Sequence, residues 1–303
     1  MQQMTVFDAP GGRAAEIAQA ATSLFLGKVL SQDGTTIAYD RIGNGPSVIL
    51  VDGALCYRGM GQSGQLAKLL ALHFTVFTYD RRGRGASGDT PPYAVEREVE
   101  DIAALLSKAG GTAFVWGISS GAALAIEAAN RLSGIKKVAL YEAPFIVDDG
   151  RSTTGRDWVR IGEAVAADRR TDAVKLFLKS VGIPGFFVAL MRLIPMWSKL
   201  KAIAHTLPYD GAIVQDNQRG KPLQVSRWAS VTVPALVMDG GKSRGMDAPR
   251  EPVTCGLIAQ CPVPHARRPD AHAEAEGARA IVGGVFQWLD RRIPHNLSER
   301  PET

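Results

Sequence analysis

The sequence predicts an α/β fold in which a mostly parallel sheet carries helices on both faces. The first observation is a set of short apolar runs with little alternation between polar and apolar residues, as parallel strands covered on both faces require. The second is that segments with helical features separate these runs, an order typical of α/β domains. The predicted parallel strands are residues 47–51, 74–79, 113–116, 137–141 and 234–238.

Helices are expected where apolar residues recur at helical spacing or where strong helix formers cluster. Residues 96–109 place apolar side chains on one side, and residues 120–132 are rich in alanine and leucine. Residues 278–289 repeat apolar residues at the same spacing, and the alanine-rich residues 14–26 are expected to form one further helix. In such a sheet ligands bind at the carboxyl ends of the strands, so the residues that end each strand are the candidates for a site.

The core is expected to begin with a hairpin. The dipeptide Asp33-Gly34 lies between strand-like residues 28–30 and 36–41, and Asp-Gly between such runs is a good hairpin signal. The long segment between the strands that end at Glu142 and begin at Pro234 reads as helices with proline and glycine breaks. The expected domains are an extension (1–27), a core (28–145 and 227–290), a helical cap (146–226) and a tail (291–303).

Composition and charge favour a soluble globular protein. The chain has 303 residues, of which 46% are hydrophobic and 21% are charged, and its net charge is +5. The sequence has no apolar run of about 18 residues, so a transmembrane helix is not expected. The polar start does not resemble a secretory signal. Three cysteines without CxxC spacing argue against a disulfide framework and a zinc site. We therefore expect a cytoplasmic protein without metal or cofactor.

Basic residues form one tight cluster in the core, at Arg81, Arg82 and Arg84. No nucleic-acid motif accompanies them, so a solvated or structural role is favoured over phosphate binding. The expected partner is a small-molecule ester. Neither nucleic acid nor a membrane is expected, and a homodimer is left open.

The candidate nucleophile is Ser119, in the sequence Gly117-Ile118-Ser119-Ser120-Gly121. This G-x-S-x-G motif is weak alone, but here an apolar strand precedes it and a helix rich in small residues follows it. A second match at residues 241–245 has prolines just downstream, where no helix can follow at once, and it reads as a loop.

Two backbone N–H groups are candidates for the oxyanion hole. The N–H of Ser120 lies at the predicted helix N-terminus, directly after the nucleophile. The loop after the first core strand should supply the other donor, the N–H of Ala54, because Gly53 lets the backbone approach closely.

The candidate general base is His272, which lies in a predicted loop before the last helix. His265 is its rival. Of the other three histidines, His73 precedes a strand, His205 lies in the predicted cap and His295 lies in the tail. A late histidine paired with an earlier serine fits acyl transfer by a serine nucleophile.

These motifs resemble the α/β-hydrolase superfamily. The resemblance rests on residues 80–87 (DRRGRGAS), the turn at Ser119 and His272, and it runs from about residue 28 to 290. It is greatest to small bacterial esterases with a helical cap. It implies that residues 80–87 tie their loop beneath the nucleophile turn. It also implies hydrolysis through an acyl-enzyme, and relatives often carry histidine where this chain has Ile118.

The resemblance leaves the third member of the triad open. Relatives usually place an aspartate where this chain has Ser243, so another carboxylate must orient His272. Glu142 is the first choice, because it ends a core strand and some haloalkane dehalogenase relatives place the acid there. Asp239 is the second choice and Asp247 a distant third.

The favoured reaction is hydrolysis of a small apolar or aryl carboxylic ester through an acyl-enzyme on Ser119. Lactone, amide or carbon–carbon bond hydrolysis, perhydrolase or cyclase activity, and a non-catalytic ligand-binding role remain alternatives. The expected substrate pocket is lined by Ile118, Leu55, Phe186 and Trp197.

Overall fold

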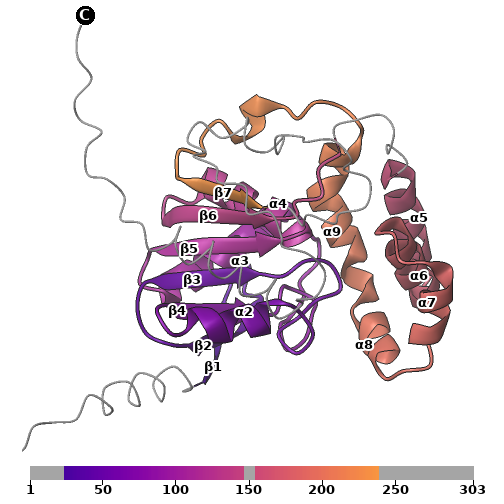
Figure 1. Cartoon of the computed structure of the whole chain (residues 1–303), viewed down its shortest axis with the longest axis horizontal. Helices are drawn as coiled ribbons and strands as arrows, with labels where there is room; N and C mark the ends of the chain where they lie inside the picture. Colours follow the sequence, from indigo (N-terminus) through magenta and orange to yellow (C-terminus); the bar gives the residue numbers. More distant parts are fainter. Residues whose placement is uncertain (1–23, 147–153, 239–303) are drawn as a thin grey trace, which may run out of the picture.

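The computed structural model describes residues 24–146 and 154–238. Their core is a seven-stranded sheet with the order β1-β2-β4-β3-β5-β6-β7 (Figure 1). β2 runs antiparallel to both of its neighbours, and the remaining pairs are parallel. The strands are β1 (Phe25–Leu30), β2 (Thr36–Ile42), β3 (Ser47–Val51), β4 (Thr75–Tyr79), β5 (Ala113–Ile118), β6 (Ile135–Tyr141) and β7 (Ala235–Met238).

Helices follow the parallel strands and fill the long connection between β6 and β7. The turns between strand and helix place the carboxyl ends of β3, β5 and β6 at one edge of the sheet. The helices are α2 (Ser63–Leu70), α3 (Val95–Lys108), α4 (Ser120–Arg131), α5 (Thr154–Ala166), α6 (Arg170–Ser180), α7 (Gly185–Met191), α8 (Met196–Ala202) and α9 (Leu207–Val214), with 3-10 turns η2 (Ala204–Thr206), η3 (Gln215–Gln218) and η4 (Val225–Trp228).

The predicted hairpin is confirmed, but it starts earlier than expected. β1 begins at Phe25, so the helix expected over residues 14–26 cannot reach its last two residues. Phe25 pairs with Arg41 of β2, and its ring packs 6.2 Å from the ring of Tyr39. Pairing with β2 therefore overrides the local helix preference at this point. The helix expected over residues 278–289 lies outside the described residues.

Each face of the sheet buries its own apolar cluster. On one face, α3 and α4 pack against the strands through residues such as Ile102 and Leu124, which are fully buried. On the other face, α2 packs through Leu66 and Leu70. The pattern of unbroken apolar strands is explained by this covering on both sides.

The helical insertion, residues 154–228, carries α5 to α9 between β6 and β7. Figure 1 shows α9 beside the sheet and α5 to α8 on its outer side. The insertion has an apolar cluster of its own, in which Trp197 and Leu200 pack with Leu55 from the loop after β3. None of the helices in the described part of the chain is long and apolar enough to cross a membrane.

Glycine at position 121 is required by the approach of α4 to β3. A Cβ at Gly121 would lie 2.3 Å from the carbonyl oxygen of Val51, so Gly121→Ala must displace backbone. We expect this change to lower the free energy of unfolding by about 3 kcal/mol or more. Gly162→Ala is the matched control, because its Cβ meets nothing within 4 Å, and it should raise stability by about 0.5–1 kcal/mol. Urea unfolding measures both, and equal losses would contradict the packing argument.

Candidate active site

Ser119 lies in a sharp turn between the end of β5 and the start of α4. Its backbone has φ 55° and ψ −126°, a sparsely populated conformation for a residue with a side chain. The N–H of Ser119 donates to the carbonyl of Tyr141 at the end of β6 (2.9 Å), which holds the turn against the sheet. A Cβ at Gly117 would lie 2.3 Å from the carbonyl oxygen of Gly121, so the flanking glycines let the turn close. The expected strand-to-helix turn at Ser119 is therefore confirmed.

The loop after β3 passes directly beside Ser119. A Cβ built on Gly53 would lie 3.1 Å from the Cβ of Ser119 and 3.7 Å from its Oγ. The carbonyl of Gly53 accepts a hydrogen bond from the buried guanidinium of Arg84 (2.7 Å). Among the described residues the Pro91-Pro92 bond is the cis peptide, so the Gly53–Ala54 bond is trans. In a trans peptide the C=O and N–H bonds point in opposite directions, so the N–H of the half-buried Ala54 points away from Arg84.

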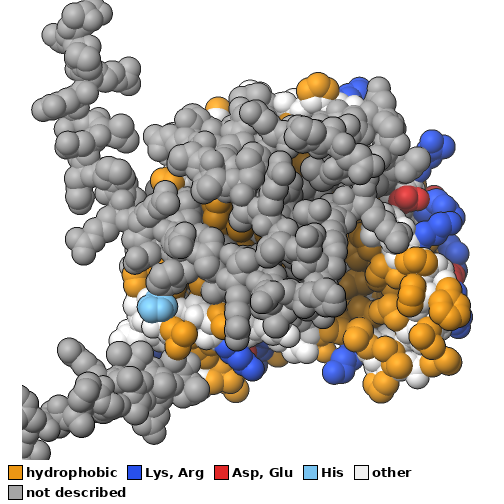
Figure 2. Space-filling model, viewed as in Figure 1, with side chains coloured by type: hydrophobic (Ala, Val, Ile, Leu, Met, Phe, Trp, Pro, Cys, Tyr) orange, Lys and Arg blue, Asp and Glu red, His pale blue; other side chains and the backbone are white. Residues whose placement is uncertain are grey.

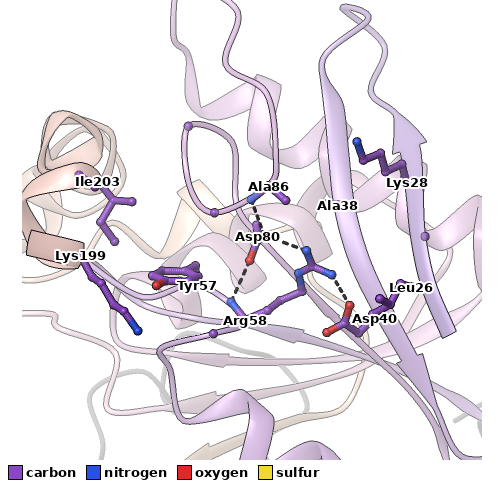
Figure 3. Close-up of a pocket in the computed structure, with 15 residues that line it drawn as sticks. Leu26, Lys28, Ala38, Asp40, Tyr57, Arg58, Asp80, Ala86, Lys199 and Ile203 are labelled. Carbon is purple, nitrogen blue, oxygen red and sulfur yellow. Dashed lines mark hydrogen bonds and ion pairs between the residues drawn. The ribbon is translucent and has the colours of Figure 1, made fainter. Parts of the chain in front are cut away.

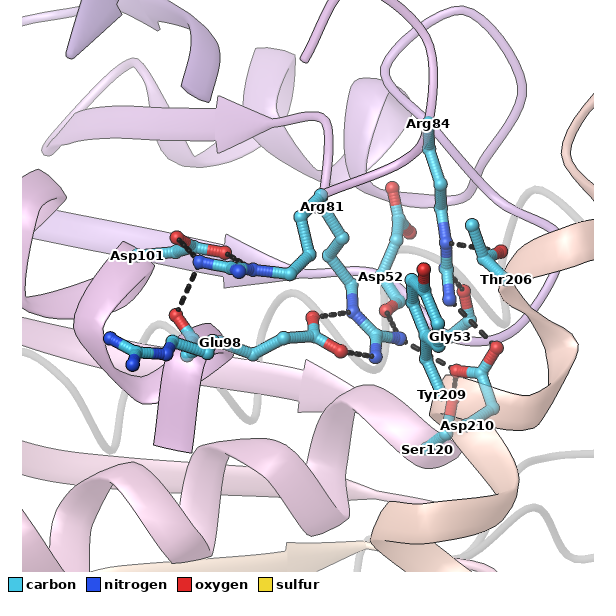
Figure 4. Close-up of polar contacts among 12 residues, drawn as sticks. Asp52, Gly53, Arg81, Arg84, Glu98, Asp101, Ser120, Thr206, Tyr209 and Asp210 are labelled. Atoms are coloured by element: carbon cyan, nitrogen blue, oxygen red, sulfur yellow. Dashed lines mark hydrogen bonds and ion pairs between the residues drawn. The ribbon is translucent and has the colours of Figure 1, made fainter. Parts of the chain in front are cut away.

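A buried polar cluster joins this loop, the turn at Ser119 and the helical insertion (Figure 4). At its centre is Asp210 of α9, which is fully buried. Its carboxylate accepts from Arg81 (2.8 Å), Arg84 (2.7 Å) and the hydroxyl of Ser120 (2.8 Å). The residue after Ser119 is thus fixed by a side chain from the insertion.

The other contacts of these arginines complete the cluster. Arg81 donates to both oxygens of Glu98 (2.6 and 2.7 Å) and to the carbonyl of Asp52 (3.3 Å). Arg84 also donates to the hydroxyl of Thr206 in the insertion (3.1 Å). Both arginines are 1% exposed. Each binds loop backbone on one side and a carboxylate on the other.

Arg82 forms ion pairs with two other acids. It donates to both oxygens of Asp101 (2.9 and 2.7 Å) and to Asp33 of the β1–β2 turn (2.9 Å). The basic cluster of the sequence is therefore buried and structural. Nothing in it is presented to a phosphate.

Charge balance sets the ionisation of Asp210. Burial raises the pKa of this carboxyl, but the charges of Arg84 and Arg81 and the Ser120 hydroxyl lower it by more. The net effect is a pKa below the usual value for aspartate, so Asp210 is a carboxylate at neutral pH. Burial lowers the pKa of Arg81, and Glu98 and Asp210 raise it well above its usual value.

Glu142 follows β6 directly, next to the turn at Ser119. Tyr141 pairs with Ile118 of β5 and Met238 of β7, so Glu142 lies at the same sheet edge as Ser119. Its backbone φ is 49°, its N–H donates to the carbonyl of Met238 (2.9 Å), and the residue is exposed. Its place as the acid therefore stays a prediction. His272, His265, Asp239, Asp247 and the second motif at residues 241–245 lie outside the described residues.

The four residues expected to line a substrate pocket differ in position. Ile118 is half-buried beside Ser119, and Leu55 is buried with φ 55° in the loop after β3. Trp197 is buried in the same apolar cluster as Leu55. Phe186 is 74% exposed on α7, so the described residues form no enclosed pocket around it. When every residue of a predicted helix is apolar, the sequence does not show which side chains point inward and which point outward.

A large open cavity of about 1040 Å³ lies between the β1–β2 hairpin and the insertion (Figure 3). On its wall Arg58 donates to Asp80 (3.0 Å) and also to Asp40. The described lining comes from β1, β2, the loops after β3 and β4, α8 and the residue after it, and Ser119 is not part of it. The two carboxylates neutralise the one arginine, so the cavity presents no net positive charge from this group.

Sequence reasoning missed Asp210 and the helix α2. No local signal marks Asp210, because its partners Arg81 and Ser120 are far away in the chain. The sequence did show three clustered arginines that would need acids if buried.

Within the described ranges, no group of three or more His, Cys, Asp or Glu could hold a metal ion.

Comparisons with known proteins point to one family. A family model described as the alpha/beta hydrolase family matches residues 43–282. A curated relative, the uncharacterized hydrolase YraK of Bacillus subtilis, is 29% identical over 154 residues. That match covers 48% of this chain and 55% of YraK, so the chain spans about half of the relative's length.

Solved structures extend the similarity over most of the chain. An alpha/beta hydrolase from Sphaerobacter thermophilus is 42% identical with a TM-score of 0.74, covering 87% of this chain and 100% of that one. An esterase from Exiguobacterium antarcticum is 18% identical with a TM-score of 0.64, covering 86% and 98%, a likeness of fold.

Proposed function

This chain belongs to the alpha/beta hydrolase family, and we propose that it is a serine hydrolase acting through an acyl-enzyme on Ser119. Its substrate is a small apolar or aryl carboxylic ester. The observation that carries the proposal is the strained turn that places Ser119 beside the loop of Gly53 and Ala54. Acyl transfer of this kind needs a nucleophile and a general base, with backbone donors close to the nucleophile, and the position of this loop supports two such donors.

In the proposed mechanism the Ser119 hydroxyl attacks the ester carbonyl and His272 takes its proton. The N–H groups of Ala54 and Ser120 hold the oxyanion, aided by the positive end of α4. His272 then gives the proton to the leaving alcohol, and a water activated by the same base releases the acid.

The buried polar cluster holds the two loops that carry the proposed oxyanion donors. Arg84 holds the carbonyl of Gly53, which turns the N–H of Ala54 to the opposite side. Asp210 holds the hydroxyl of Ser120, which favours a fixed peptide after Ser119. Donors fixed before the reaction need not reorganise when negative charge develops, which lowers the barrier.

We assign the helical insertion as a cap over the site, with Ile118, Leu55 and Trp197 as the inner residues that favour an apolar acyl group. Leu55 joins the two units, because it comes from the loop beside Ser119 and packs in the insertion's cluster. Phe186 is assigned no substrate contact, since its side chain is exposed on α7.

The acid of the triad is proposed to be Glu142, with Asp239 as second choice. We expect Glu142→Gln to lower kcat by more than about tenfold, because an unoriented His272 adopts the wrong tautomer. Asp239→Asn is the matched comparison and should keep most of the activity. The kcat of both variants on a p-nitrophenyl ester decides the matter, and the reverse order would move the acid to Asp239.

A fluorophosphonate probe tests the nucleophile directly. It should label the wild type on the peptide that contains Ser119, and labelling should disappear in Ser119→Ala. Ser107→Ala is the control, because the Ser107 hydroxyl is exposed on α3 and donates to a helix carbonyl. Absence of labelling in the wild type would favour the non-catalytic ligand-binding alternative. Labelling without ester turnover would favour a lactone, amide or carbon–carbon bond substrate, or the perhydrolase or cyclase alternatives.

A further inference from the structure

A continuous apolar surface lies on the outer side of the helical insertion, over α7, the turn after it and the first residue of α8. Figure 2 shows hydrophobic side chains gathered in this region. We call it the α7 surface. Its six residues are between 42% and 81% exposed: Phe186, Phe187, Leu190, Leu193, Ile194 and Met196.

The α7 helix is unusual for a helix at a protein surface. Its sequence, GFFVALM, has no polar residue, yet Val188 alone of these seven is buried. A helix that is apolar all round is normally enclosed by protein or lipid. Apolar residues scattered singly are common at surfaces, but a contiguous group of large ones marks an interaction site.

The segment that carries the α7 surface has acidic residues nowhere and basic residues at several positions. Residues 173–209 contain five lysines and arginines and no aspartate or glutamate. Within the part of the chain that the structure describes, no ion pair involves Lys179, Arg192 or Lys199, and all three are exposed. These cations are therefore free to meet an external anionic surface.

From these observations we infer that the α7 surface binds the headgroup region of an anionic lipid bilayer. Apolar side chains including phenylalanine and leucine, bordered by lysine and arginine, are the composition of helices that lie in a membrane interface. Each nearby cation adds attraction to an anionic leaflet, equivalent to about fivefold in partitioning.

A second copy of this chain fits the surface less well. A twofold contact through the α7 surface would bring the cations of residues 173–209 of both copies together, without acids from the same stretch to balance them. The sequence predicts no membrane partner, and within the described residues no helix is long and apolar enough to span a bilayer. Surface binding needs none, and it is independent of the proposed hydrolase activity.

Vesicle sedimentation with the full chain tests the inference. The wild type should sediment with vesicles of phosphatidylcholine containing phosphatidylglycerol, and much less with phosphatidylcholine alone. The double variant Leu190→Ser with Leu193→Ser should lower partitioning roughly tenfold or more. The matched control is Leu30→Ser with Leu72→Ser, which removes two leucines of similar exposure (66% and 49%) elsewhere and should change nothing.

Charge is tested by Lys179→Gln with Arg192→Gln, which should weaken binding to the anionic vesicles by roughly 25-fold. Circular dichroism of each variant confirms that it is folded. Equal losses in the matched control, or no sedimentation of the wild type, would overturn the inference. A concentration-dependent dimer lost in the Leu190 and Leu193 variant, without vesicle binding, would assign the surface to a second copy instead.

Discussion

Replacing Ser119 with alanine is expected to lower kcat on a p-nitrophenyl ester by roughly 10⁴-fold or more, to near the background rate. The change removes the hydroxyl proposed to form the acyl-enzyme, while the proposed backbone donors beside it remain. Since alanine keeps the Cβ, the strained backbone at φ 55° is unchanged and the protein should fold normally. Steady-state kinetics across acyl chain lengths, with a thermal melt of both proteins, measures the effect.

Two results would contradict this prediction. Residual turnover within about tenfold of wild type would show that another group carries the reaction. Absence of wild-type turnover at every chain length would reject the simple esterase and leave a specialised substrate or a binding role. Ser120→Ala is a useful comparison, because it should keep the nucleophile and lose only the contact with Asp210.

The second large effect is expected for Asp210→Ala. This change leaves Arg81 and Arg84 buried with reduced compensation, because each loses a carboxylate at 2.7–2.8 Å. Removing one partner from a buried ion pair typically costs about 3–5 kcal/mol of unfolding free energy. Urea unfolding should therefore show a clear loss of stability, and ester turnover should fall with it because the donor loops loosen.

Asp216→Ala is the matched control for Asp210. It removes an aspartate six positions later whose partner, Arg219, is 62% exposed. Surface pairs of this kind contribute about 0–1 kcal/mol, so the control should be nearly neutral. A loss at Asp216 as large as at Asp210 would show that burial of the pair is not the cause.

The lowered pKa of Asp210 also predicts how stability depends on pH. An acid whose pKa is lower in the folded state stabilises the fold fully above its unfolded value of about 4. That contribution is lost as the pH falls below 4 toward the folded pKa. Asp210→Asn should therefore differ most from wild type near neutrality, and the difference should shrink in acid. Unfolding midpoints between pH 3 and 7 measure it, and a constant difference would contradict the assignment.

The strands could be predicted well because their apolar runs are long and their burial is uniform. β3 and β7 agree within a residue with the predicted ranges, and the parallel sheet follows from their order. Phe25 and Leu26 were assigned to a helix, since nothing local shows that Arg41 and Asp40 would pair with them. The helix α2 was not predicted, and its first N–H is held by the distant Asp52 (3.4 Å).

The candidate site was predictable where it depends on short motifs. The turn at Ser119 follows from two glycines at fixed spacing, and the structure explains both by close backbone contacts. Asp210 could not be found in this way, because it acts through contacts with residues about 90 to 130 positions earlier. Phe186 was expected inside and lies outside, since the apolar helix α7 has no polar side to reveal its orientation.

The position of Asp210 constrains how such a protein can diverge. The acid belongs to the long connection between β6 and β7, while the three groups that bind it belong to the core. Replacing this connection with that of a relative therefore removes the carboxylate of a buried ion-pair network and also changes any substrate contacts. Chimaeras should fold only when the incoming segment brings a carboxylate at this place, or when the core arginines are replaced together. The connection and the core therefore depend on each other through Asp210.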